Sequence, residues 1–166
     1  MAYQKLQVGL GTRVNPNDSF DIPNPSGEVY TGTADALTSE TLLVDNNGDF
    51  IDKGIKPGMV VYNTSGASVY SSTVDSITDE TTLVLSNNNL ESFGQGSAYA
   101  IYTNIDNPGC VLYVGGGIDG VGDLDIITSS GSEVVLKNVL QGSFVPVQVK
   151  RVKAELTTAT DILAFW

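Results

Sequence analysis

Three polar side chains in the first third of the chain have the spacing of a calcium-binding loop. Asp45, Asn47 and Asp49 occupy alternate positions, as the first three ligands of such a loop do. Phe50 replaces the glycine that the loop needs next, and Lys56 stands where its last position supplies a bidentate glutamate. The segment therefore predicts an Asn-rich turn and no metal site.

A second acidic set, Asp119, Asp123 and Asp125, lies among glycines further along the chain. Glycine-rich segments with regularly spaced aspartates bind calcium where the segment repeats, because each repeat supplies only part of a site. Only one partial copy is present here. These side chains are therefore expected on turns and on the solvated face of a strand.

The same region matches the G-x-G-x-x-G pattern of dinucleotide-binding loops through Gly115, Gly117 and Gly120. Such a loop must open a helix, because the helix N-terminus holds the pyrophosphate. The residues that follow, VGDLDII, alternate as a strand does. The glycines are therefore expected to form a hairpin turn, and the sequence predicts no cofactor.

The sequence lacks the residues that usually activate a catalytic nucleophile. There is no histidine, and Cys110 is the single cysteine, so a Ser-His-Asp set, an intramolecular disulfide and a cysteine-based zinc site are all excluded. Cys110 is expected to be a small buried residue. Asp18 and Asp21 could be the paired carboxylates of a glycosidase, but spacing along a β-protein does not identify such pairs. The chain is expected not to be an enzyme and to have no catalytic, cofactor-binding or metal-ligating residues.

The charge balance argues against nucleic acid as a partner. The 166 residues carry a net charge of −11 with only eight Lys and Arg, whereas phosphate binding needs clustered cations. One basic cluster, Lys150, Arg151 and Lys153, alternates with valines and is expected on the wet side of a strand. No apolar run approaches the length of a membrane span, and the start lacks a signal-peptide core. The protein is expected to be made and kept in a cytoplasm, or released by lysis.

Strand patterns and turn residues alternate along the chain, at spacings of about 8–12 residues, which is typical of an all-β sandwich or barrel. Pro146 lies inside one pattern and indicates an edge strand or a bulge there. The predicted strands are 6–10, 40–44, 59–63, 68–74, 81–86, 98–103, 111–114, 123–127, 133–136, 144–152 and 161–166.

A segment of twelve residues occurs twice in similar form. TADALTSETLLV, residues 33–44, and TVDSITDETTLV, residues 73–84, are identical at seven of twelve positions without a gap. At the same offset of 40, Asn47 corresponds to Asn87, Gly54 to Gly94, Val61 to Ile101 and Tyr62 to Tyr102. Two copies are too few for a solenoid, so residues 33–63 and 73–103 are expected to form a pseudo-twofold module that closes as a small barrel or sandwich.

The sequence segments on both sides of this module are rich in proline: DIPNPSG precedes it and IDNPG follows it. Insertions are tolerated between such turn segments. We therefore expect an inserted, barrel-like β-module at 28–106. The discontinuous segments 1–27 and 107–166 are expected to form a β-sandwich or barrel base domain.

The outer segments carry a further pattern: Pro16, Asp18, Pro23, Gly122-Asp123, Asn138-Val139, Gly142, Pro146, Arg151-Val152, Ala154, Thr157 to Ile162 and Ala164. This pattern resembles a family of small phage virion proteins that includes the head spike base proteins of phage-like gene transfer agents. Glu155 and the final Phe165-Trp166 depart from it. The module resembles a β-domain common in phage structural proteins through Phe50, Gly54-Ile55, Pro57-Gly58, Val61, Asn63, Val74 and Ser76-Ile77.

The resemblance implies a virion structural protein of the capsid surface, often at vertices, that forms homo-oligomers and carries a fibre. The implied partners are further copies of the chain, the major capsid protein or other virion proteins, and a spike or fibre protein, with no nucleic acid and no membrane. The implied location is the virion, assembled in the host cytoplasm.

Two other readings stay open at this point. The same β-modules recur in tail and baseplate proteins, and exposed Tyr30, Tyr62, Tyr70 or Trp166 could serve a carbohydrate-binding module. The chain end, DILAFW, is a predicted strand whose two aromatic residues should be docked. They dock either in their own core or against a neighbouring subunit, because aromatic residues are favoured interface anchors.

Overall fold

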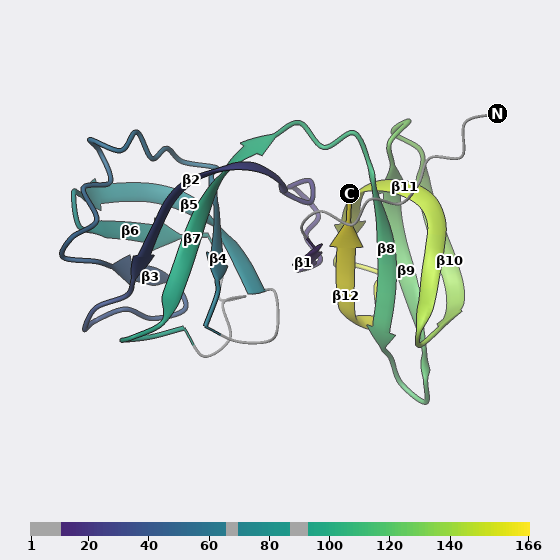
Figure 1. The fold of residues 1–166 in the computed structure, drawn as a ribbon. Coiled ribbons are helices and arrows are strands. Elements are labelled where there is room, and N and C mark those ends of the chain that lie inside the picture. The colour runs from purple at the N-terminus through teal and green to yellow at the C-terminus, as the bar shows by residue number, and fades with distance from the viewer. Residues whose placement is uncertain (1–10, 66–69, 87–92) are drawn as a thin grey trace. The chain divides into compact units, whose positions relative to one another are not determined.

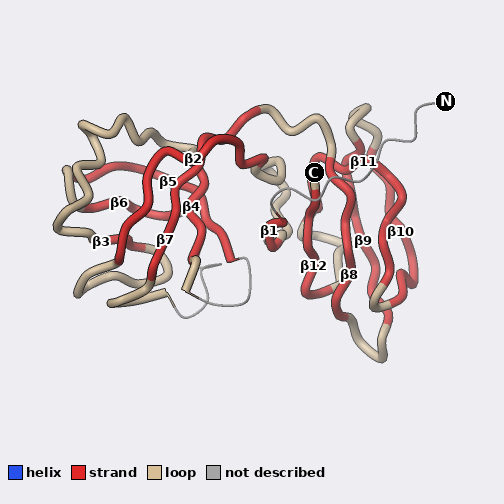
Figure 2. Tube along the Cα trace, viewed as in Figure 1, coloured by secondary structure: helices blue, strands red, loops and turns tan. Residues whose placement is uncertain are grey.

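The computed structural model of the chain describes residues 11–65, 70–86 and 93–166 (Figure 1). Every regular element in these residues is a strand, and Figure 2 shows the strands joined only by loops and turns. The abundance of β-branched residues explains this content, since such side chains fit a pleated surface. The all-β prediction is confirmed. The predicted strand 6–10, Asn87 and the first residues of the predicted strand 68–74 lie outside the described residues.

The chain divides into two compact units. The outer unit comprises, of the described residues, 11–24 and 106–166, and the inserted unit comprises residues from Pro25 to Ile105. These boundaries lie close to those expected from the two proline-rich segments, although the first of these segments runs into strand β2 (Asn24–Thr33) and is not a turn.

The outer unit is a six-stranded sheet in the order β1-β12-β8-β11-β9-β10, in which every described pair is antiparallel. Its strands are β1 (Gly11–Arg13), β8 (Cys110–Gly116), β9 (Val121–Thr128), β10 (Glu133–Leu140), β11 (Ser143–Lys153) and β12 (Thr160–Phe165). Strand β11 pairs with β8 near its start and with β9 near its end, and its register shifts between Val145 and Val149. Pro146 lies at this bulge in an interior strand, so the bulge and not the edge is the correct alternative.

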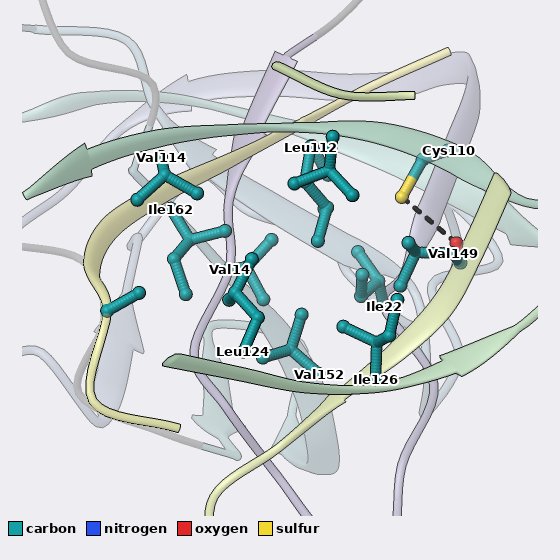
Figure 3. Close-up of a cluster of buried hydrophobic side chains, with 13 residues drawn as sticks. Val14, Ile22, Cys110, Leu112, Val114, Leu124, Ile126, Val149, Val152 and Ile162 are labelled. Atoms are coloured by element: carbon teal, nitrogen blue, oxygen red, sulfur yellow. Dashed lines mark hydrogen bonds between the residues drawn. The ribbon is translucent and has the colours of Figure 1, made fainter. Parts of the chain in front are cut away.

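The core of the outer unit lies between β8 and β9 (Figure 3). Alternate residues of each strand point inward, among them Leu112 on β8 and Leu124 and Ile126 on β9. Val14 and Ile22, from the segment after β1, fill the same core. Their burial explains why the short N-terminal piece of the outer unit stays attached to the distant C-terminal one.

The glycine-rich turn after β8 is not a hairpin turn, because β11 lies between β8 and β9 in the sheet. The turn runs from Gly117 to Gly120, which has a φ of 80°. A Cβ on Gly117 would lie 2.2 Å from the carbonyl oxygen of Val121, and one on Gly115 would lie 2.7 Å from that of Asp161. Close approach of backbone accounts for these glycines, and β9 follows them where a dinucleotide site needs a helix.

The inserted unit is a second six-stranded sheet, in the order β2-β7-β4-β5-β6-β3; of the barrel and the sandwich that the sequence left open, the closed barrel is excluded. Its strands are β2 (Asn24–Thr33), β3 (Leu42–Val44), β4 (Val60–Asn63), β5 (Tyr70–Asp79), β6 (Thr82–Leu85) and β7 (Ala98–Ile105). Strand β2 is absent from the predicted strands because its sequence, NPSGEVYTGT, begins with residues that are typical of turns. It is an edge strand, where Pro25 can lack an N–H without breaking a ladder.

The repeated line of sequence pairs with itself across the sheet. Leu43 of β3 lies opposite Leu83 of β6, and these are equivalent positions of the repeat at the offset of 40. The flanking hydrogen bonds are related in the same way: Asp45 N donates to Thr81 O at 2.9 Å, and Leu85 N donates to Thr41 O at 2.9 Å. A pseudo-twofold axis therefore passes between the two leucines.

In the second half of each repeat, equivalent residues are no longer 40 positions apart. Val74 N donates to Met59 O, and Ala34 N donates to Ser97 O, both at 2.8 Å. Val74 and Ala34 are 40 positions apart, whereas Met59 and Ser97 are 38 apart. The second copy is thus shorter by two residues between β6 and β7.

The ungapped alignment is therefore wrong beyond the first half of the repeat. By backbone bonding the equivalent of Val61 is Tyr99, and the equivalent of Tyr62 is Ala100. The structure similarly relates Gly58 to Gly96, in place of the pairing of Gly54 with Gly94. The ungapped offset of 40 matched Val61 with Ile101. In the structure these two residues face each other as ladder partners in β4 and β7, and they are not equivalent positions of the repeat.

Candidate functional site

The first residue of the calcium-like spacing is part of a buried polar cluster. Asp45 is buried, and its Oδ2 accepts a hydrogen bond of 2.5 Å from the hydroxyl of Tyr99. The hydroxyl of Tyr30 lies 3.5 Å from the same oxygen and donates to Asn47 O at 2.9 Å, while Asn47 N donates to Asp45 Oδ1 at 2.9 Å. The carboxylate of Asp45 thus holds its own loop together and faces the interior.

Tyr99 makes this cluster sensitive to alkaline pH. Burial, followed by the hydrogen bond to Asp45, raises the pKa of Tyr99 above its ordinary value of 10.0. Above that pH the unfolded chain releases the phenolic proton while the folded chain keeps it, so the free energy of unfolding falls by about 1.4 kcal/mol per pH unit. We expect this stabilisation to be complete below pH 10 and lost as pH rises. Tyr99→Phe should remove this part of the slope, measured by urea unfolding at a series of alkaline pH values.

The two aspartates of the hypothetical glycosidase pair are fixed by structural bonds. Asp18 Oδ1 accepts a hydrogen bond from Ala154 N at 2.9 Å, which ties the N-terminal segment to the loop after β11. Asp21 forms ion pairs of 2.8 Å with Arg151 and 3.7 Å with Lys150. The basic cluster is thus neutralised by neighbouring carboxylates.

Cys110 lies in the core of the outer unit, where its Sγ donates to Val149 O at 3.1 Å (Figure 3). Burial raises the pKa of this thiol to about 12. A thiol that stays protonated is a poor nucleophile.

The four aromatic residues proposed for carbohydrate binding are not exposed. Tyr62 is buried, while Tyr30 and Tyr70 pack against the core of the inserted unit. Trp166 packs against the core of the outer unit, and its Nε1 donates to Asn107 Oδ1 at 3.2 Å. Tyr62 therefore offers no ring face to a sugar, the other three rings are half-buried, and Trp166 is docked in its own unit.

A row of aromatic rings on the outer unit, of which Phe144 is exposed and Tyr113 and Phe165 are half-buried, is the strongest candidate for a binding surface. Tyr113 on β8 and Phe144 on β11 are cross-strand partners whose ring centroids are 5.3 Å apart. The ring of Phe165 on β12 lies 6.3 Å from that of Phe144. Phe144 is 56% exposed, and Phe165 covers Gly11 of the edge strand β1. We call Tyr113, Phe144 and Phe165 the aromatic row.

The aromatic row occupies the face of its strands that points away from the core. Leu112, Val145 and Ala164 neighbour the row residues in sequence and are buried, so the row residues point the other way. The charged groups on this face of β1 and β12 are Arg13 and Asp161, which form an ion pair of 2.8 Å. The face is thus apolar and carries a balanced charge, although the chain as a whole is acidic.

Sequence reasoning singled out Phe165 and missed Tyr113 and Phe144. Both lie next to buried residues, Leu112 and Val145, in the segments VLYV and SFVPV, on the side of the strand where a polar residue is expected. An aromatic residue on the polar side of an alternating strand was therefore the available signal.

Within the ranges 11–65, 70–86 and 93–166, no group of three or more His, Cys, Asp and Glu side chains is placed to hold a metal ion. Nor do these ranges contain a helix of the length and hydropathy that would cross a membrane. Comparison with protein-family models, with curated proteins and with solved structures found no match.

Proposed function

We propose that the protein is a structural component of a bacteriophage virion, acting by self-assembly and by docking on the capsid surface, as spike base proteins at vertices do. The observation that carries this proposal is the aromatic row. Monomeric proteins rarely leave apolar side chains grouped on the open face of a sheet, and such groups mark protein interfaces. The resemblance of the outer segments to virion proteins indicates which kind of assembly this is.

The partner proposed for the aromatic row is a second copy of the chain. Copies with a charge of −11 repel one another, so self-association favours the surface with the least net charge. The aromatic row lies on such a surface, because Arg13 and Asp161 neutralise each other beside it. The inserted unit is the opposite case, with ten acidic and two basic residues, and is therefore not proposed as the surface of self-contact.

The expected result of Phe144→Ser is a large loss of self-association. Truncating a central aromatic anchor typically costs about 2 kcal/mol or more of binding free energy, which is roughly a 30-fold higher dissociation constant. Analytical ultracentrifugation over a range of concentrations measures this. Phe20→Ser is the matched control, because Phe20 is 74% exposed but lies outside the row, in the segment between β1 and β2. Equal association of both variants and the native chain would contradict the proposal.

The location of the protein is tested on intact particles. Cryo-electron microscopy of a particle carrying the protein should show it on the shell with threefold or fivefold symmetry. A tail or baseplate role, the alternative that the β-modules suggest, predicts threefold or sixfold symmetry on the tail axis. Absence of the protein from purified particles would overturn both.

A further inference from the structure

Asp125 is a buried carboxylate in an unusual state. It lies on β9 between its ladder partners Val135 of β10 and Lys153 of β11, and its side chain is 0% exposed. Among the described residues, neither of its carboxylate oxygens accepts a hydrogen bond. A buried ionised carboxylate without donors is expensive, because it loses its hydration and gains little in return. The arrangement therefore needs a specific explanation.

The nearest cationic group is the amine of Lys153. Its Nζ lies 3.6 Å from Asp125 Oδ2, beyond hydrogen-bond distance, and 2.5 Å from Glu133 Oε1 on β10. The three side chains come from three adjacent strands and share one face, with the amine between the two carboxylates. The Lys153 side chain is only 17% exposed.

A neighbouring ion pair shows what ordinary pairing looks like on the same face. Lys137 Nζ lies 2.8 Å from Asp123 Oδ2, and Asp123 Oδ1 also accepts a hydrogen bond from Asn138 N. That carboxylate is partly exposed and has donors on both oxygens. Asp125, by contrast, is shielded from solvent and has no donor within hydrogen-bond distance among the described residues, so the amine of Lys153 at 3.6 Å is its nearest compensating group.

We propose that Lys153 and Asp125 form an intramolecular amide bond that links β11 to β9. The amine starts charged, because its hydrogen bond with Glu133 raises the pKa of Lys153. Before the bond forms, one proton must move from Nζ of Lys153 to the carboxylate of Asp125, whose Oδ2 is 3.6 Å away, which leaves a neutral amine and a neutral carboxyl group. This inference does not rest on the proposed virion function.

The remaining steps balance without any other reactant. Nζ attacks Cγ of Asp125 and forms the N–C bond. Glu133 accepts a second proton from the nitrogen and delivers it to the departing hydroxyl group. The C–O bond breaks, one water molecule leaves, and Glu133 returns to its initial state. The product amide is neutral, which removes the buried charge of Asp125.

The mass of the denatured protein tests this directly. We expect the intact mass to be lower than the sequence mass by one water molecule. Trypsin should then fail to cut after Lys153 and should release residues 54–137 joined to residues 152–166. The full sequence mass after prolonged incubation of the native chain would overturn the proposal and leave an ordinary ion-pair triad.

Four variants separate the bond from a structural role of the same residues. Lys153→Arg keeps the charge and should have its full sequence mass. Asp125→Asn can form the same amide by releasing ammonia, so its final mass should equal that of the linked native chain. Glu133→Gln should slow the loss of water strongly. Lys137→Arg, in the ordinary pair, should retain the full mass deficit, and loss of the deficit there would count against the assignment.

Discussion

Leu83→Ala is expected to destabilise the inserted unit by about 2–5 kcal/mol, the range for a buried leucine whose site cannot collapse. Leu83 is fully buried and lies opposite Leu43, also fully buried, on the pseudo-twofold axis. Because the axis gives the two leucines related surroundings, Leu43→Ala should cost a similar amount. Denaturant unfolding followed by the near-ultraviolet circular dichroism of tyrosine measures both, since most tyrosines lie in this unit.

The double variant tests whether the two leucines act on each other. Cross-strand partners on one face are close enough for their effects to be non-additive, by about 0.5–3 kcal/mol. Leu37→Ala is the matched control, because Leu37 is 83% exposed and its loss should change the unfolding free energy by no more than about 0.5 kcal/mol. Very different costs for Leu43→Ala and Leu83→Ala would mean that the sequence repeat does not reflect equivalent packing.

The repeat shows where sequence reasoning succeeds and where it stops. The similar sequences of residues 33–44 and 73–84 predict equivalent strands, and Leu43 and Leu83 indeed lie on one axis. The pairing of Gly54 with Gly94 fails because a two-residue shortening in a loop leaves no mark in an ungapped comparison. The ungapped comparison therefore matched Tyr62 with Tyr102, whereas the structure relates Tyr62 to Ala100.

The outer unit gives the same lesson for the candidate site. Alternation located its strands from 110 onward, and Pro146 marked the bulge of β11. The order of strands in a sheet is set by contacts between residues far apart in the sequence. The sequence pattern therefore did not predict that β11 lies between β8 and β9. The burial of Asp125 was hidden for the same reason, because an aspartate in an alternating strand is normally solvated.

The polar cluster of Asp45 and Tyr99 breaks the pseudo-symmetry of the inserted unit. The equivalents of these residues in the other copy are Leu85 and Val61, both buried and apolar. Each of the two related places takes one residue from each copy: one place is filled by the hydrocarbon of Leu85 and Val61, and the other by the carboxylate of Asp45 and its donor Tyr99. Equivalent backbone surroundings accept either solution, provided that both members of the pair are of the same kind.

Tyr99→Phe should therefore destabilise the protein by about 1–3 kcal/mol or more, because it strips a direct donor from a buried carboxylate. Adding Asp45→Leu should recover much of that loss, since leucine stands at the equivalent position and the buried carboxylate is removed together with its donor, at the cost of the bond from Asn47 N. Denaturant unfolding near neutral pH measures the cycle. The control is Tyr102→Phe, whose hydroxyl meets the exposed Glu28 at 3.3 Å and should matter little.

The stability of the double variant relative to Tyr99→Phe alone shows whether an apolar pair can replace Asp45 and Tyr99. If the double variant is less stable than Tyr99→Phe alone, the carboxylate of Asp45 contributes through its bond to Asn47 N, and the apolar alternative does not fit this half of the unit. If it is more stable, the two copies are interchangeable in packing, and the polar pair is a local substitution within a duplicated apolar design. We expect the second result, because Leu85 and Val61 already occupy the related site without strain on its backbone bonds.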